Sequence, residues 1–127
     1  TLNGTNVSFA GAVGSMAAPI AVMKINASNT VTFGELTTVG HLETGSSGTT
    51  RFNTASVVTT SASSMVFNND VVITVANFTF DSTNGGALAT GANITFNKTL
   101  TSAISGFSGV RIQAGTSGVV SLVGTVG

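Results

Sequence analysis

The sequence offers few side chains that could do acid–base or metal chemistry. Its single histidine, His41, is flanked by Glu35 and Glu43, and its other carboxylates are Asp70 and Asp81. A hydrolytic triad needs a histidine between a nucleophilic serine and a carboxylate, and no nucleophile-elbow pattern accompanies His41. One histidine without any cysteine also falls short of a zinc site. We therefore expect a loop histidine, no catalytic residue, no metal ligand and no cofactor.

The two aspartates are the remaining candidates for chemistry. Enzymes that cleave polysaccharides on a β-helix need clustered carboxylates, as glycoside hydrolysis does, and Asp70 and Asp81 could stack on neighbouring coils. Calcium is the alternative for exposed carboxylates, but the Gly-Gly-x-Gly-x-Asp nonapeptide is absent. With four acidic residues in the whole chain, both hypotheses rank below a non-enzymatic function.

Asparagines form the largest group of side chains open to modification. Because Asn, Ser and Thr are so common, the excess of Asn-x-Ser/Thr sequons, the acceptors of N-linked glycans, is modest. Asn93 and Asn97 flank one expected strand, which suits outward-facing positions. The alternative is that these are turn asparagines, some of them stacked in ladders between coils. The sequons begin at Asn3, Asn6, Asn26, Asn77, Asn93 and Asn97.

Charge is scarce along the chain. Only four basic and four acidic residues occur, and the formal net charge is zero. A typical globular domain is about 25% charged, and nucleic-acid-binding proteins carry a basic patch, so we expect no nucleic acid as a partner. Surfaces without net charge associate readily. This favours a chain that lies against other protein, through assembly or through covalent continuation.

Strand-forming and turn-forming residues dominate the remaining composition. Thr and Val suit the pleated surface of a sheet, the 16 glycines join Asn and Ser in supplying turns, and no capped helical periodicity occurs. Cysteine is absent, so no disulfide can staple the fold. No apolar run is long enough for a membrane span, and no signal segment opens the chain. Because the chain begins at Thr1, we expect a processed protein or a piece of a longer one.

A short motif that ends in phenylalanine recurs along the chain. The residue two before each Phe shares its side of a strand, and that residue is apolar in five of the six copies, Thr50 being the exception. The Phe-to-Phe steps of 24, 19, 15, 13 and 16 residues fit the coils of a solenoid. We interpret these side chains as a stacked core. The copies end in Phe9, Phe33, Phe52, Phe67, Phe80 and Phe96.

A longer internal similarity accompanies the motif. Residues 5–28 align without gaps to residues 92–115, and a chain that ends with a block like its first one is typical of repeat proteins. The matched pairs include Phe9 with Phe96, Ile20 with Phe107, Lys24 with Arg111, and Ile25 with Ile112.

The whole pattern predicts one domain, residues 1–127, without a linker. Further strands are expected between the motif copies, and Gly-rich or Ser-rich joints separate them. We predict an all-β fold, a parallel β-solenoid of roughly five to seven coils, each about 20 residues long. The further strands are expected at residues 21–26, 36–39, 56–60, 71–75, 110–114 and 119–123.

Several of these stretches resemble the repeats of filamentous-haemagglutinin-like and autotransporter-like exoproteins. The likeness covers most of the chain and is strongest at residues 1–40 and 92–127. It implies a right-handed parallel β-helix, secretion through the outer membrane, and a role in adhesion, cell contact or matrix building. No secretion domain is recognisable, so the chain matches the shaft of such proteins. The stretches that carry the resemblance are residues 5–14, 22–27, 31–34 and 92–97.

The sequence favours a structural function. Residues 119–127 are apolar and strand-like without a charged cap, which is typical of a segment that continues into another copy. The leading hypothesis is a subunit or repeat of an extracellular bacterial surface filament, whose partners are copies of itself end to end, as a homopolymer or as tandem repeats. The alternative is the adhesin shaft of a two-partner-secretion or autotransporter-type exoprotein, with glycans or the surfaces of host or neighbouring cells as partners. A phage tail-spike, a polysaccharide-active β-helix and an ice-binding face, suggested by Thr30-Val31-Thr32, rank lower.

Overall fold

The computed structural model describes residues 1–54, 56–105 and 109–127. In this part of the chain every regular element is a strand, and all strand pairs are parallel. The strands are β1 (Leu2–Phe9), β2 (Ile20–Phe33), β3 (Thr37–Thr44), β4 (Thr49–Phe52), β5 (Ser56–Thr59), β6 (Met65–Phe67), β7 (Asp70–Ile73), β8 (Phe78–Asp81), β9 (Ile94–Phe96), β10 (Leu100–Ser102), β11 (Val110–Gln113) and β12 (Val120–Leu122).

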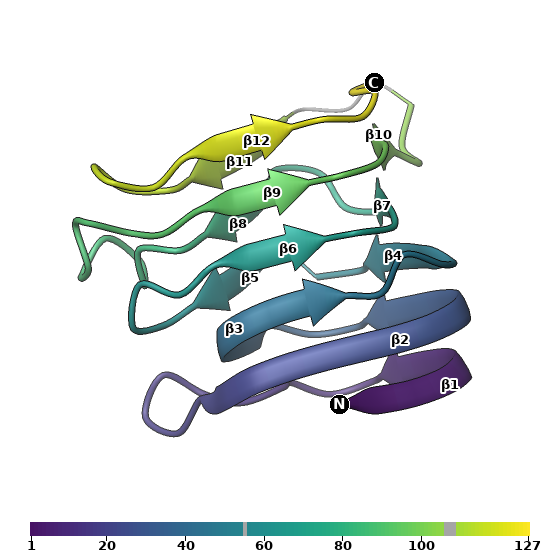
Figure 1. Ribbon diagram of the computed structural model, residues 1–127, viewed down its shortest axis with the longest axis horizontal. Helices are drawn as coiled ribbons and strands as arrows, with labels where there is room; N and C mark the ends of the chain where they lie inside the picture. Colours follow the sequence, from purple (N-terminus) through teal and green to yellow (C-terminus); the bar gives the residue numbers. More distant parts are fainter. Residues whose placement is uncertain (55, 106–108) are drawn as a thin grey trace.

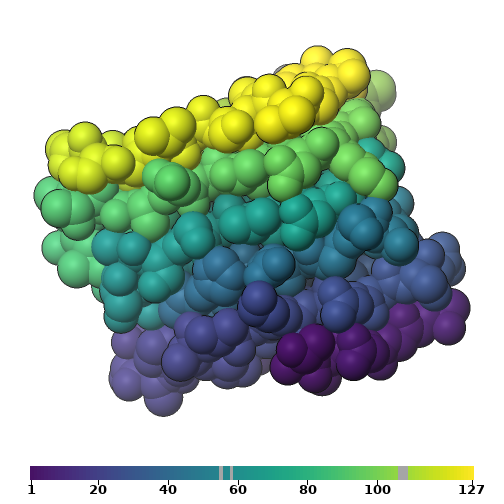
Figure 2. All heavy atoms as spheres, viewed as in Figure 1, coloured from purple at the N-terminus to yellow at the C-terminus, as the bar shows by residue number. Residues whose placement is uncertain are grey.

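The strands wind into a β-solenoid with three faces (Figure 1). Face 1 holds the start of β1, the first half of β2, the second half of β3, and then β6, β9 and β12. Face 2 holds the second halves of β1 and β2, and then β4, β7 and β10. Face 3 holds the start of β3, and then β5, β8 and β11. The chain visits the faces in this order, and Figure 2 shows the successive turns lying as layers from the N-terminus to the C-terminus.

Strand register places equivalent residues of successive turns in columns along the axis. One column on face 2 runs the length of the solenoid, and its inward side chains are Val7, Val31, Thr50, Val71, Leu100 and Val126. The described chain therefore makes about five turns. The predicted fold class, an all-β parallel solenoid of five to seven coils, is confirmed.

Inward side chains from the three faces fill the axis with a continuous apolar core. Phe33, Phe52, Phe67 and Phe80 are fully buried and Phe96 is almost so, whereas Phe9, in the first turn, is half-buried. Along face 2 the rings of Phe9, Phe33 and Phe52 stack at centroid distances of 5.1 and 5.2 Å. Rings at these separations attract one another beyond their area of burial.

The spacing of the Phe motif is explained by the three faces. Phe9, Phe33 and Phe52 share a column on face 2, so the steps of 24 and 19 residues are complete turns. Phe67 and Phe96 form a stacked pair on face 1, whereas Phe80 lies on face 3. The interpretation of every step as one coil was therefore wrong for the three shorter steps, which are fractions of a turn.

The similarity between residues 5–28 and 92–115 does not follow the turns. Phe9 lies on face 2 but its match, Phe96, lies on face 1, and Ile25 on face 1 is matched with Ile112 on face 3. Each of these two pairs is thus displaced by one face. The alignment reflects the alternation of inward and outward residues that all these strands share. The match of Ile20 with Phe107 lies outside the described residues.

Candidate functional site

A polar cluster lies on the outer surface of face 1 and spans three successive turns. The Lys24 ammonium nitrogen lies 2.6 Å from a carboxylate oxygen of Glu43, and the same oxygen lies 3.6 Å from His41 Nε2. On the other side of the ring, Ser64 Oγ lies 3.1 Å from His41 Nδ1. The hydrogen bond from Lys24 holds the pKa of Glu43 below its ordinary value of 4.5, against the opposing effect of partial burial. The expected position of His41 in a loop was wrong, because it lies within β3.

The cluster has the order serine, histidine, carboxylate, and its carboxylate also binds Lys24. Ser64, His41 and Glu43 line none of three hollows on the surface of the described residues. Glu43 is also engaged with Lys24, an arrangement that ties neighbouring turns together. We infer that the cluster links turns across the outside of the solenoid. Ser64 could not be assigned to it from the sequence, because Ser64 lies 23 positions from His41.

The carboxylates considered for other chemistry are not brought together. Asp70 lies on face 2, where its Oδ1 accepts a hydrogen bond from the Thr99 N–H at 3.1 Å. Asp81 is buried at the end of β8 on face 3, where it accepts bonds from the Thr83 hydroxyl and N–H, both at 2.6 Å, and from the Gly85 N–H. Their expected stacking on neighbouring coils was wrong, because they occupy different faces. Within the described ranges, no three His, Cys, Asp or Glu side chains gather into a metal-binding group.

The sequon asparagines occupy corners and strand edges, and most of them bond to a neighbouring turn. Asn26 Nδ2 donates to Asn3 Oδ1 at 3.0 Å, and Asn97 Nδ2 donates to Asn68 Oδ1 at 2.7 Å. Glycan attachment at Asn26 or Asn97 would replace one of the two hydrogens on the donating Nδ2, since this nitrogen is the acceptor of the sugar. Three others bond as acceptors or occupy a turn: Asn6 accepts from Asn29, Asn93 accepts from the Val119 N–H, and Asn77 has a φ of 57°.

The outward threonines of face 2 do not form a regular array. Thr30 and Thr32 are followed on the next turns by Thr49 and Arg51, then by Asp70 and Val72, and finally by Thr99 and Thr101. An ice-binding face needs the same pair at every turn, and two charged side chains interrupt this one.

Exposed apolar side chains concentrate at the two ends of the solenoid. Within the described ranges, every large hydrophobic residue that is strongly exposed belongs to the first 36 residues or to the last nine. The turns between them expose no such side chain. Those at the ends are Leu2, Met16, Ile20, Val22, Leu36, Val119, Val120, Leu122, Val123 and Val126.

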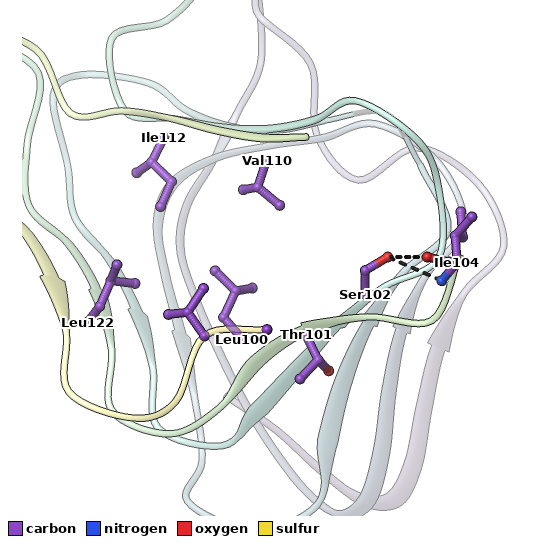
Figure 3. A pocket seen from close by; sticks show the side chains of 9 residues that line it. Leu100, Thr101, Ser102, Ile104, Val110, Ile112 and Leu122 are labelled. Carbon is purple, nitrogen blue, oxygen red and sulfur yellow. Dashed lines mark hydrogen bonds between the residues drawn. The ribbon is translucent and has the colours of Figure 1, made fainter. Parts of the chain in front are cut away.

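The C-terminal end of the solenoid is hollow. A cavity of about 540 Å³ opens there between the last strands of all three faces. Figure 3 places Val110 and Ile112 of β11 on one side of this end cavity, and Leu100 and Leu122 on the other. These side chains point inward, yet no further strand on face 3 lies above β11 in the described chain. The cavity therefore lies beside the edge of β11 that no strand of the described chain pairs with.

Comparison with known proteins leaves the fold and these surfaces as the basis for function. No family model, curated protein or solved structure matches the chain. The class that the fold defines is a parallel β-solenoid. A search of the described residues finds no helix that is both long and apolar enough to cross a membrane.

Proposed function

We propose that the chain is a structural unit of an extracellular surface filament, and that its ends are covered by further β-solenoid turns. The observation that carries the proposal is the location of the exposed hydrophobic residues at the two ends. A free monomer would gain from charged or helical caps there, since exposed strand edges and apolar patches promote association. The first and last turns have apolar side chains in those places.

The mechanism is the continuation of contacts that already hold the turns together. Within the solenoid, each turn forms parallel backbone hydrogen bonds with the turns before and after it, and its inward side chains pack on theirs. Only nearest turns interact in such a structure. A turn added at either end would therefore make the same kind of contact as an internal turn makes.

The near absence of charge supports this function. With a formal net charge of zero, no long-range repulsion opposes the approach of two copies. The location outside the cell is part of the proposal, and it is supported by the resemblance of residues 1–40 and 92–127 to exoprotein repeats. Glycans and cell surfaces would contact the sides of such a filament.

Self-assembly of purified protein tests the function. We expect sedimentation velocity to show species that grow with concentration, electron microscopy to show fibres, and fibre diffraction to show an axial spacing of about 4.8 Å. Val120→Lys places a charge on the exposed last strand of face 1 and should prevent growth. Val66→Lys, the same change on the outer surface of a middle turn, should not.

Two results would contradict the proposal. One is a wild-type chain that has the circular dichroism of a β-protein and stays monomeric up to millimolar concentration. The other is a fibre without the axial spacing of stacked strands, because such a fibre would not use the solenoid ends.

A further inference from the structure

We propose that copies join head to tail by an exchange at the C-terminal end. In this joint, residues 2–9 of an incoming copy replace residues 122–127 of the receiving copy, at the end of face 1 and above β10. The inference rests on the proposed function and adds the partner, the polarity and the register of the contact. It follows from a coincidence of position, because both segments occupy the same columns, Leu2 and Leu122 on face 1 and Val7 and Val126 on face 2.

The register identifies the two segments as equivalent. Val7 begins the long column of face 2 and Val126 ends it, so each is the inward residue of the same position on the solenoid. Val126 is held by a single isolated bridge to Leu100, with backbone hydrogen bonds of 2.9 Å from Leu100 N–H to Thr125 and 3.1 Å from Gly127 N–H to Leu100. The incoming copy offers a longer strand for the same edge, since β1 runs to Phe9.

The end cavity fits the side chain that this strand would deliver. The column that holds Phe9, Phe33 and Phe52 continues through Ile73 and ends at Ser102, a small residue that lines the cavity. Phe9 stacks on Phe33 of its own copy at 5.1 Å and is half-buried. In the joint, the exposed side of the Phe9 ring lies over Ser102, and the ring fills the cavity.

The other two faces continue in the same register. On face 3, the incoming copy's Val13 belongs to the column that ends at Ile112 of the receiving copy. On face 1, the incoming copy's Met23 belongs to the column that ends at Val120. All three faces therefore gain their next strand at once, which a partner of another fold would not provide. This agreement assigns the site to a second copy of the chain.

The strand directions make the joint polar. All strands of a face run in one direction, so a copy turned end for end would present antiparallel strands and a different order of faces. A head-to-tail contact uses two different surfaces and leaves one of each free. Such contacts generate open filaments when they do not close a ring.

Two backbone N–H groups allow the joint to be blocked from either side. Gly34 N–H donates to the Phe9 carbonyl at 2.8 Å, so Phe9 bonds to β2 and the neighbouring Ser8 N–H points away from it. Ala103 N–H donates to the Ile73 carbonyl at 2.9 Å, so Ser102 N–H points away from β7. Both groups face the joint. Proline is tolerated where a strand's N–H faces solvent, and Ser8→Pro and Ser102→Pro each remove one donor.

Mixing the two variants tests partner and polarity together. At a concentration where the wild type forms long species in sedimentation velocity, each proline variant alone should be monomeric. An equimolar mixture should form a dimer and stop, because only one open end of each kind remains. Ser8→Ala and Ser102→Ala keep the N–H groups and should assemble like the wild type. We expect each proline to weaken joining at least about tenfold.

The contradicting outcomes separate this inference from the proposed function. If either proline variant dimerises alone, the contact is symmetric and the polarity is wrong, although self-assembly stands. If Ser8→Pro assembles as the wild type does, β1 is not in the joint. If the folded wild type never assembles, the proposed function fails and this joint fails with it.

A second pair of variants tests the exchange itself. Val126→Asp weakens the segment that the incoming strand must displace, and should lower the assembly concentration about threefold, because a larger fraction of copies is competent to join. Val119→Asp adds the same charge before the displaced segment, at a residue whose carbonyl accepts from the Ile94 N–H, and should have a smaller effect. If Val126→Asp instead weakens assembly more than Val119→Asp does, the incoming copy sits on the tail and the exchange is wrong.

Discussion

The middle turns and the end turns of the solenoid are built from the same kinds of residue, but they differ in what covers them. Phe52 and Phe9 lie in one column with the same inward direction, yet Phe52 is fully buried and Phe9 is half-buried. Phe52 has a neighbouring turn on both sides along the axis, whereas Phe9 has one on one side only. Among the inward residues of one column, burial is thus decided by position along the axis rather than by residue type.

Polar side chains show the same contrast. In the middle, Asn69 is buried, and its Oδ1 accepts hydrogen bonds from the Thr44 and Thr50 hydroxyls at 2.8 and 3.0 Å. Near the N-terminal end, Asn29 donates to Asn6 at 2.9 Å on an exposed corner. Water can replace the exposed bond of Asn29 but not the two buried bonds of Asn69. A comparison of equivalent substitutions at the two locations therefore measures what an added turn contributes.

The largest expected effect is that of Phe52→Ala. Its ring contacts those of Phe33, Phe67, Phe78 and Phe80, with centroid distances from 5.0 to 5.9 Å. Loss of so enclosed a ring should lower the free energy of unfolding by about 3–5 kcal/mol. Urea unfolding followed by circular dichroism measures this loss. A change below about 1 kcal/mol would mean that the middle of the core is loosely packed.

Asn69→Ala should have the next largest effect. It leaves two buried threonine hydroxyls without their acceptor, a cost of about 2–3 kcal/mol. Asn29→Ala is the matched control and should cost about 0.5 kcal/mol, because its bond is exposed. Equal losses in urea unfolding would show that burial along the axis does not decide the value of these bonds.

The sequence predicted what depends on local alternation. Strand composition, the inward Phe residues and the approximate number of coils follow from a period of two and from the frequency of turns. The expected strands at residues 71–75 and 110–114 overlap β7 and β11. The sequence predicted one strand at residues 21–26 and another in the motif that ends in Phe33. In the structure β2 continues across the corner between them as one strand of 14 residues.

The assignment of residues to faces could not be predicted from the sequence. Turn length varies, from 19 residues between Val31 and Thr50 to 29 between Val71 and Leu100, so no fixed period relates one Phe to the next. For the same reason the proximity of Ser64 to His41, 23 positions apart, carries no signal in a single sequence. The cavity beside residues 119–127 could not be predicted either, because it depends on strands of three faces meeting.

Phe9→Ala tests the end of the column and should have a smaller effect than Phe52→Ala. One side of the Phe9 ring packs on Phe33 and the other faces the open end, so we expect a loss of about 1 kcal/mol in the monomer. In assembled protein the loss should rise toward the value for a core phenylalanine, about 3 kcal/mol, since the joint buries the second side. Unfolding measured below and above the assembly concentration separates the two values. An identical loss in both states would place Phe9 outside the joint.

The smallest expected effect is on the pH dependence of stability, and it comes from the outer surface of β2 and β3. Lys24 keeps the pKa of Glu43 below 4.5 in the folded chain, so the stabilisation that it provides is present above the unfolded value and is lost as the pH falls through the lower folded value. Both side chains are partly exposed, and solvent screening limits the contribution to about 0.5 kcal/mol or less. Lys24→Gln should therefore flatten the free energy of unfolding between about pH 5 and pH 3. Lys98→Gln, whose lysine bonds to the Ser46 carbonyl, removes the same charge elsewhere and should leave that slope unchanged. An equal flattening by both variants would mean that net charge, and not the contact across two turns, sets the pH response.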